Sequence, residues 1–344
     1  MSGPVDATPS GPVVCFGEVL MRLSTPAGQL IADAPALDIA IGGAEANVAV
    51  ALAAMGHKAR FLGRLPANAL GLRAQAALAG AGVDVAHCPQ APGRMGLYVL
   101  ETGASLRPSA ITYDRAGSAF ASAAPGDFAF AQALEGAALL HLSGITPALG
   151  PGGVALARAA IAAAQAAGVP VSFDCNFRAN LWSAWDSDPR ALLTELIGAA
   201  SLLFANHRDM TLLLGRPFSG DGPERRREAA EAAFAAFPRL QVMASTARTP
   251  LTQTHHRLAA RVDLPTARHQ TAEINITDIV DRVGSGDAFA AGVLSAWLEG
   301  GDAAAMAGRG LAMNALKHSV RGDWLRLPRS AIEGFCPQPA DVQR

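Results

Sequence analysis

The sequence predicts an α/β protein of the three-layer α/β/α kind, in which helices cover both faces of a mostly parallel sheet and a small β lid lies beside it. Three observations lead to this fold class. Short apolar runs alternate with alanine-rich stretches, two regions break that alternation, and 50% of the 344 residues are hydrophobic. Alanine is the best helix former, and buried parallel strands are continuous apolar runs. Repeated strand–helix units form right-handed crossovers, which place helices on both faces.

The expected elements follow in chain order. Apolar runs predict strands at 13–16, 138–142, 169–173, 201–204 and 240–244. Alanine-rich stretches between them predict helices over 152–167, 189–200 and 224–236. Two further helices are expected, one ending near Gly56 and one running from Asp287 to about Leu298.

Two segments, 20–41 and 95–121, are richer in Gly, Pro and Thr than the rest. Residues 96–101 also alternate between polar and apolar side chains. We expect short antiparallel strands there, outside the main sheet, which form a lid over its edge. Because an exposed strand edge can pair with another copy of the chain, a homo-oligomer is expected.

No linker or repeat divides the chain, so one domain is expected over residues 13–330. Residues 1–12 are rich in Gly, Pro and Ser and lack the basic start and apolar stretch of a signal peptide. They are predicted to be a disordered leader, and residues 331–344 a C-terminal tail.

The composition excludes several functions. A formal net charge of -1 gives no reason to expect nucleic acid or a membrane as partner. The only lysines, Lys58 and Lys317, do not lie in a Gly-Lys-Ser/Thr loop, which excludes P-loop nucleoside triphosphatases. The 4 cysteines form no CxxC pair, so zinc and a disulfide framework are not expected. No apolar run reaches the roughly 18 residues of a membrane span, and we expect a cytoplasmic protein.

Polar residues follow three of the predicted strands, where ligands of open α/β sheets bind. Any one of them could be a helix cap or a turn residue, but three successive polar loops favour a polar site. These residues are Asp174, Asn176 and Arg178, then Asn206 and Asp209, then Ser245, Thr246 and Arg248.

A glycine-rich segment from Asp281 to Gly292 carries the sharpest signal. Gly284, Ser285 and Gly286 allow a tight turn, and Asp287 opens a helix whose bare N–H groups can bind an anion. Asp287 could be a helix cap without chemistry. Beside a bound phosphate, however, its carboxylate is placed to take a proton from an attacking hydroxyl group.

A second segment, residues 42–50, opens another helix with a pair of glycines. Glycines let a small polar ligand approach the backbone, and Asn47 can both donate and accept hydrogen bonds. A helix start would explain the glycines equally well.

Both segments resemble the two signatures of the ribokinase-like (phosphofructokinase B) carbohydrate kinases. Gly42-Gly43-x-x-x-Asn47-x-Ala49 is similar to the first signature, and Asp281-x-x-Gly284-Ser285-Gly286-Asp287 to the second. The resemblance extends from about residue 13 to 327, and within the family it is strongest to the 2-keto-3-deoxygluconate kinases. The other matching stretches are 65–71, 113–119, 174–178 and 316–323.

The resemblance implies an ATP- and Mg²⁺-dependent kinase whose small-molecule substrate is a sugar acid. Asp287 would be the catalytic base, and Gly284, Ser285 and Gly286 the anion hole for the transferring phosphoryl group. The implied substrate contacts are Gly43, Ala44, Glu45, Asn47, Tyr98, Tyr113, Arg115, Arg178 and Asp323. The implied ATP contacts are Asn176, Arg178, Asn206, Ser245, Arg248, Gly284 and Gly286, and Asp209 would reach the metal through water.

Three positions depart from the family pattern. The family's usual Thr, two residues after the first Asp of the second signature, is Val283 here, so the resemblance does not imply activation by a monovalent cation. The family's Asn-x-x-Glu is Asn206-x-x-Asp209 here, with a shorter carboxylate. The glycine-rich strand and turn of the ATP site is replaced by Ser245-Thr-Ala-Arg248.

An acid substrate is also favoured by the residues themselves. On a strand, Tyr113 and Arg115 would project from one face, and an arginine over a pocket can pair with a carboxylate. Arg115 could instead be a solvated lid residue, and Arg178 offers a second cation.

Other functions remain open. One is a fructokinase or nucleoside kinase of the same family. A dehydrogenase is disfavoured because no second glycine follows Gly17, and an aldolase because neither lysine is placed for a Schiff base. A non-catalytic sugar-binding protein is possible only if Asp287 takes no part in a reaction.

Overall fold

The computed structural model describes residues 10–337, and nothing is said below of the structure outside this range. Most of the predicted leader and half of the predicted tail lie outside the described residues. The tail's first residues belong to a helix, α12 (Arg329–Glu333), which crosses the expected boundary at residue 330.

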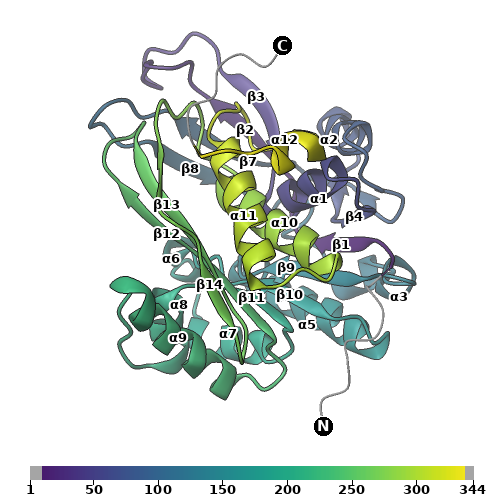
Figure 1. Ribbon diagram of the computed structural model, residues 1–344. Helices are drawn as coiled ribbons and strands as arrows, with labels where there is room; N and C mark the ends of the chain where they lie inside the picture. The colour runs from purple at the N-terminus through teal and green to yellow at the C-terminus, as the bar shows by residue number, and fades with distance from the viewer. Residues whose placement is uncertain (1–9, 338–344) are drawn as a thin grey trace.

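Within the described range, the central sheet has the strand order β14-β13-β12-β11-β10-β9-β1-β4, with β15 paired to β13 (Figure 1). Its strands are β1 (Val13–Phe16), β4 (Ala59–Leu62), β9 (Leu139–Ser143), β10 (Val171–Asp174), β11 (Leu202–Phe204), β12 (Val242–Pro250), β13 (His256–Asp263), β14 (Arg268–Gln270) and β15 (Ile274–Ile276). From β4 to β12 all neighbours are parallel. The antiparallel pair β12–β13 starts an edge that the sequence prediction did not include.

The helices flank this sheet, as the α/β prediction requires (Figure 1). Those before β11 are α1 (Ala44–Ala54), α2 (Ala69–Gly80), α3 (Phe130–Ala133), α4 (Ile145–Ala148), α5 (Pro151–Ala166), α6 (Ala179–Trp182) and α7 (Pro189–Ile197). Those after it are α8 (His207–Leu214), α9 (Gly222–Ala236), α10 (Ser285–Leu298), α11 (Ala303–Lys317) and α12. A short 3₁₀ helix (Pro125–Asp127) and a β5–β6 pair (Leu65–Pro66 with Gln90–Ala91) complete the body.

Two hydrophobic cores lie on opposite faces of the sheet because successive strand residues point to opposite sides. In β1, Val13 and Cys15 belong to the core beneath α1, α10 and α11, while Val14 and Phe16 belong to the core beneath α5 and α7. All four side chains are fully buried. This double burial explains why the sheet strands are apolar without alternation, and it confirms the three-layer prediction.

The lid is a separate sheet with the order β3-β2-β7-β8. Its strands are β2 (Leu20–Ser24), β3 (Asp38–Gly42), β7 (Gly96–Glu101) and β8 (Ala110–Asp114). The outer pairs are antiparallel, but β2 and β7 run parallel, so the expectation of antiparallel strands throughout was wrong. The cause is topological, because the chain passes through α1, β4 and α2 of the main body between the two central lid strands.

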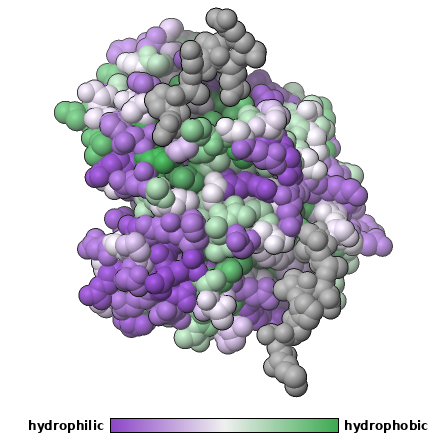
Figure 2. Space-filling view, viewed as in Figure 1, coloured by the Kyte–Doolittle hydropathy of each residue, from purple (hydrophilic) through white to green (hydrophobic). Residues whose placement is uncertain are grey.

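One end of the molecule is strongly hydrophilic. Figure 2 shows hydrophilic residues gathered over the region of α8 and α9. Helix α9 carries consecutive arginines, and its buried face consists mainly of alanines. Among the described residues, no helix has the length and apolar character needed to cross a bilayer.

Candidate active site

A cavity of about 400 Å³ lies between the lid and the carboxyl ends of the parallel strands. Lid strands contribute Leu20, Tyr98, Ile111 and Tyr113 to its wall. The main body contributes the ends of β10 and β12 and the first turns of α1 and α10. The cavity therefore lies where ligands bind in open α/β sheets.

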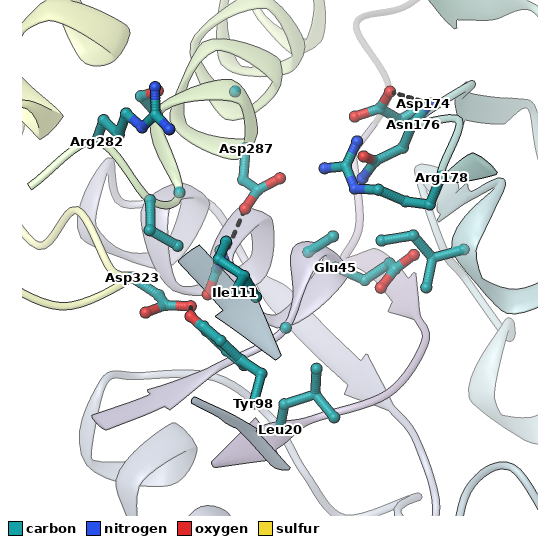
Figure 3. Close-up of a pocket in the computed structure, with 18 of the residues that line it drawn as sticks. Leu20, Glu45, Tyr98, Ile111, Asp174, Asn176, Arg178, Arg282, Asp287 and Asp323 are labelled. Carbon is teal, nitrogen blue, oxygen red and sulfur yellow. Dashed lines mark hydrogen bonds between the residues drawn. The ribbon is translucent and has the colours of Figure 1, made fainter. Parts of the chain in front are cut away.

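Asp287 faces this cavity from the first turn of α10 (Figure 3). Its Oδ2 accepts a hydrogen bond of 2.6 Å from Nδ2 of Asn47, which lies in the first turn of α1. Burial raises the pKa of Asp287 to about 6, although the Asn47 hydrogen bond and the charge of Arg178 oppose this shift. The two glycine-rich segments of the sequence thus meet at one carboxyl group.

The turn before α10 has the shape of an anion site. No side chain caps the helix, and within the described residues the N–H groups of Gly286 and Asp287 donate no hydrogen bond. Bare N–H groups at the start of a 14-residue helix attract a phosphate. Gly284 has a φ of 82°, and a Cβ there would lie 2.0 Å from the carbonyl oxygen of Asp323. Only glycine allows this turn to pack against residue 323.

The predicted sugar-binding segment also lines the cavity. Gly43, Ala44, Glu45 and Asn47 all belong to its wall. Gly43 has a φ of 131°, and a Cβ there would lie 2.2 Å from the carbonyl oxygen of Glu18, so glycine is required. Glu45 accepts a hydrogen bond of 2.5 Å from Ser143, and burial raises its pKa to about 7.

Arg115 lines the cavity, but its surroundings differ from the sequence expectation. Strand β8 ends at Asp114, so Tyr113 and Arg115 do not share a strand face. Tyr113 is 43% exposed, whereas Arg115 is 6% exposed. Nε and Nη2 of Arg115 both donate to Oε2 of Glu18, at 2.8 and 2.5 Å. Arg115 is therefore a buried, paired side chain rather than a solvated lid residue, because the chain turns inward after β8.

Asp323 is also held by protein groups. Its Oδ2 accepts a 2.5 Å hydrogen bond from the hydroxyl group of Tyr98, and its Oδ1 lies 3.1 Å from Nη1 of Arg22. Nη2 of Arg22 lies 2.7 Å from Asp281. Tyr98 and Arg22 come from the lid and the two aspartates from the main body, so this network joins the two sheets. Figure 3 shows the Tyr98 hydroxyl directed at Asp323.

A second cavity of about 240 Å³ adjoins the first beyond Asp174. Six of the predicted ATP and metal residues line it, and they are Asn176, Arg178, Asn206, Asp209, Ser245 and Gly286. Arg248 instead lines the first cavity, and Gly284 does so too.

Asn206 and Asp209 have a local structural role as well. Asn206 accepts a hydrogen bond from the N–H of Arg208, and Oδ2 of Asp209 accepts one of 2.8 Å from the N–H of Asn206. This capping box starts α8. Capping alone explains both residues, while their position on the second cavity wall agrees with a phosphate or metal role.

Three arginines of the first cavity form no ion pair among the described residues: Arg178, Arg248 and Arg282. In the described part of the chain, the one other cationic side chain in the wall of this cavity is that of Arg115, which pairs with Glu18, and the remaining charged side chains there are acidic. Figure 3 shows Asp287 between Arg282 on one side and Arg178 on the other. Guanidinium groups without a carboxylate partner are suited to anionic ligands such as phosphates and carboxylates.

Sequence reasoning missed three polar residues of the first cavity: Glu18, Arg282 and Asn314. Glu18 follows a predicted strand, and Arg282 lies inside the motif of Asp287, so the position of each in the sequence could have indicated a place in the site. Asn314 lies within α11, where nothing in the local pattern distinguishes it.

Among the described residues, no group of His, Cys, Asp and Glu has the geometry of a preformed metal site. The carboxyl groups of Asp174, Asp209 and Asp287 are nevertheless close enough to affect one another. Burial, together with the charges of Asp287 and Asp209, raises the pKa of Asp174 to about 8. Such a concentration of carboxyl oxygens fits a hard divalent cation such as Mg²⁺.

A carboxyl group beside bare helix N–H groups, at the strand ends of a doubly wound sheet, is suited to phosphoryl transfer between small molecules. Residues 11–328 match the family described as pfkB family carbohydrate kinase. The chain therefore belongs to this family and is a carbohydrate kinase, which confirms the resemblance found in the two glycine-rich motifs.

Three similar proteins can be compared with the chain. A 2-dehydro-3-deoxygalactonokinase from Haloferax volcanii is 34% identical over 315 residues, which are 90% of this chain and 92% of the relative. The crystal structure of a 2-dehydro-3-deoxygluconokinase from Thermotoga maritima has a TM-score of 0.89 and 36% identity, and covers 94% of this chain and 98% of its own. An Escherichia coli structure of the ribokinase II type, solved with ATP and Mg²⁺, has a TM-score of 0.78 at 18% identity, covering 94% of this chain and 98% of its own. At that identity it supports the fold alone.

Proposed function

We propose that the protein transfers the γ-phosphoryl group of ATP to the 6-hydroxyl group of 2-dehydro-3-deoxy-D-gluconate. The observation that carries the proposal is Asp287, which faces the cavity beside the bare N–H groups of α10. The names of the Haloferax and Thermotoga relatives support a 2-dehydro-3-deoxy sugar acid as substrate. Because one name refers to the galactonate-derived acid, that epimer is the second candidate.

In the proposed mechanism the two cavities bind different reactants. The sugar acid occupies the larger one, and its hydroxyl group gives its proton to Asp287 while its oxygen forms the new bond to phosphorus. The bond to the leaving ADP oxygen breaks on the opposite side. The N–H groups of Gly286 and Asp287 stabilise the charge of the transferring group. Asn47 orients the base through its hydrogen bond.

Two buried amide oxygens support a hydroxylated substrate. Asn47 and Asn314 line the larger cavity and are each 4% exposed, and their Oδ1 atoms have no hydrogen-bond partner among the described residues. A buried acceptor without a donor is costly, and sugar hydroxyl groups can supply donors.

The metal of this reaction would be Mg²⁺, which neutralises phosphate charge and orients the phosphates. Asp174 and Asp209 line the second cavity and would hold it, directly or through water. We expect turnover to stop in excess EDTA and to return when Mg²⁺ is added. Full turnover in EDTA would contradict this assignment, and Zn²⁺ at equal free concentration is the control for metal identity.

The substrate can be tested with purified protein and a coupled assay for ADP release. The panel contains the gluconate- and galactonate-derived 2-dehydro-3-deoxy acids, fructose, ribose and a nucleoside. We expect the highest kcat/KM for the gluconate-derived acid. Preference for a neutral sugar would overturn the substrate, and binding without turnover of any compound would indicate a sugar-binding protein.

The pH dependence gives a separate test of the base. Asp287 acts as a base only when its carboxyl group is ionised, and burial raises its pKa to about 6. We therefore expect kcat/KM to fall about tenfold per pH unit below that pKa and to level off above it. A profile that is flat down to pH 5, about one unit lower, would contradict the assignment. The Tm measured over the same pH range separates this effect from acid unfolding.

We also propose that the protein is a cytoplasmic homo-oligomer that associates through the lid. Exposed apolar side chains lie on or beside its strands, among them Ile39 of β3, which is 45% exposed. Because β3 and β8 are the edge strands of the lid sheet, they can pair with another copy. Sedimentation analysis of the wild type and of Ile39→Lys tests this, and a monomeric wild type would contradict it.

A further inference from the structure

Lys317, the last residue of α11, is fully buried at 0% exposure. It is one of two lysines in a chain where arginine supplies the other positive side chains, and the second, Lys58, is exposed. A buried ammonium group is costly unless it is paired and hydrogen-bonded. The proposed mechanism does not use Lys317, so the burial of its ammonium group must have another cause.

The Lys317 ammonium group joins two loops below the anion turn. Its Nζ donates hydrogen bonds to the backbone carbonyl oxygens of Val320, at 2.8 Å, and of Asp281, at 3.3 Å. Asp281 leads directly into the 284–286 turn, and Val320 belongs to the loop that follows α11. Lys317 does not line either ligand cavity. It contacts the scaffold of the turn and not the space for substrates.

Other bonds tie the same two loops together. The N–H of Gly322 donates to Oδ2 of Asp281 at 3.0 Å, and Gly284 packs against the carbonyl of Asp323. The position of the turn that presents the N–H groups of Gly286 and Asp287 therefore depends on how the two loops are held together.

The charges around Lys317 require a cation. The carboxylates of Asp281 and Asp323 both act on it, and within residues 10–337 Arg22 is the one cation that ion-pairs with them. Burial lowers the pKa of Lys317, while the charges of Asp281 and Asp323 oppose that shift. One guanidinium cannot balance two buried carboxylates, so the ammonium supplies the second positive charge.

We propose that Lys317 acts as a built-in monovalent cation that fixes the 284–286 turn in its phosphate-binding shape. The inference rests on the proposed phosphoryl transfer, in which this turn holds the transferring group. Carbonyl oxygens bind monovalent cations by replacing their water shell, and an ammonium group presents the same compact charge. A planar guanidinium does not fit between two carbonyls in this way, which explains a lysine in an arginine-rich chain. Lys317 is thus a positioning residue, and the enzyme needs no added K⁺ or NH₄⁺.

The test compares two substitutions that remove the same charge. Lys317→Ala leaves a space lined by carbonyl and carboxylate oxygens, whereas Lys317→Met fills that space with an uncharged chain. We expect both to lower kcat by roughly ten- to a hundred-fold, the value of a charge-assisted hydrogen bond, with little change in the KM of the sugar. Ammonium or potassium chloride, exchanged against choline chloride at constant ionic strength, should restore kcat and raise the Tm of Lys317→Ala only.

The controls for this test are the wild type and Lys58→Ala. Wild type and Lys58→Ala should have the same kcat and Tm in choline, potassium and ammonium salts. Stimulation of the wild type by K⁺ would overturn the inference, as would unchanged kcat in Lys317→Met, or a folded Lys317→Ala that neither cation rescues. If wild type phosphorylates no compound of the panel, the proposed function fails instead, and the cation-dependent Tm of Lys317→Ala still tests the cation site.

Discussion

Replacing Asp287 with Asn is expected to lower kcat by about 10²- to 10⁴-fold, the usual effect of removing a general base. Asparagine has nearly the same size and keeps an oxygen that can accept the hydrogen bond from Asn47. It cannot take a proton from the sugar hydroxyl. Because the N–H groups of the α10 turn are unchanged, the Kd of ATP should stay close to the wild-type value. Both quantities are measured on one protein preparation, by ADP release and by calorimetric titration.

Asp278→Asn is the matched control for this substitution. Asp278 lies nearby in the chain, is exposed, and has a φ of 52° that asparagine tolerates. It should behave as wild type. More than about a tenth of wild-type kcat in Asp287→Asn would exclude this carboxylate as the base. Loss of ATP binding in the same variant would instead indicate that Asp287 shapes the anion turn.

Much of the fold was predictable because the sheet is buried on both faces. A strand such as β1, which contacts two cores, must be apolar at every position, and it was predicted with its observed ends. The antiparallel edge was not predicted. Strand β13 contains Arg257, Arg261 and Asp263, so its charges interrupt the apolar run. The ion pair that joins Asp263 to Arg227 of α9 spans 36 positions of the chain, and a local pattern does not reveal it.

Some features of the site were also predictable from the sequence, and others were not. The turn at 284–286 and the segment at 43–47 were predictable because backbone constraints select glycine at Gly284 and Gly43. Their hydrogen-bonded junction, Asn47 with Asp287, spans 240 positions of the chain and only the fold reveals it. The pairing of Arg115 with Glu18 is similarly distant in sequence. Sequence reasoning predicts which side chains reach the cavity more reliably than which are already partnered.

Because Arg115 is paired with Glu18, a contact between Arg115 and the substrate carboxylate cannot be tested with Arg115→Ala alone. Arg115 and Glu18 are 6% and 4% exposed, and Nη1 of Arg115 has no hydrogen bond among the described residues. Arg115 can therefore still donate to a substrate, but Arg115→Ala alone leaves an unpaired carboxylate in the cavity wall. That carboxylate would repel an acid substrate even if Arg115 never touched it.

The double variant Glu18→Gln with Arg115→Ala separates these two effects, because it removes the cation without leaving a buried charge. If Arg115 contacts the substrate carboxylate, the KM for the 2-dehydro-3-deoxy acid should rise roughly ten- to a hundred-fold relative to Glu18→Gln alone. The KM values for ATP and for a neutral sugar should stay almost unchanged. Arg115→Lys should lose less, since the charge remains but the planar fork does not.

Arg94→Ala provides the lid control, because Arg94 pairs with Asp114 at the exposed surface. An equal rise in KM for acid and neutral substrates in the double variant would mean that Arg115 only shapes the lid. Arg178, which forms no ion pair among the described residues and lines both cavities, then becomes the candidate. Arg178→Ala would in that case raise the KM of the acid selectively. If it raises the KM of ATP instead, Arg178 binds phosphate, and neither arginine supports the choice of an acid substrate.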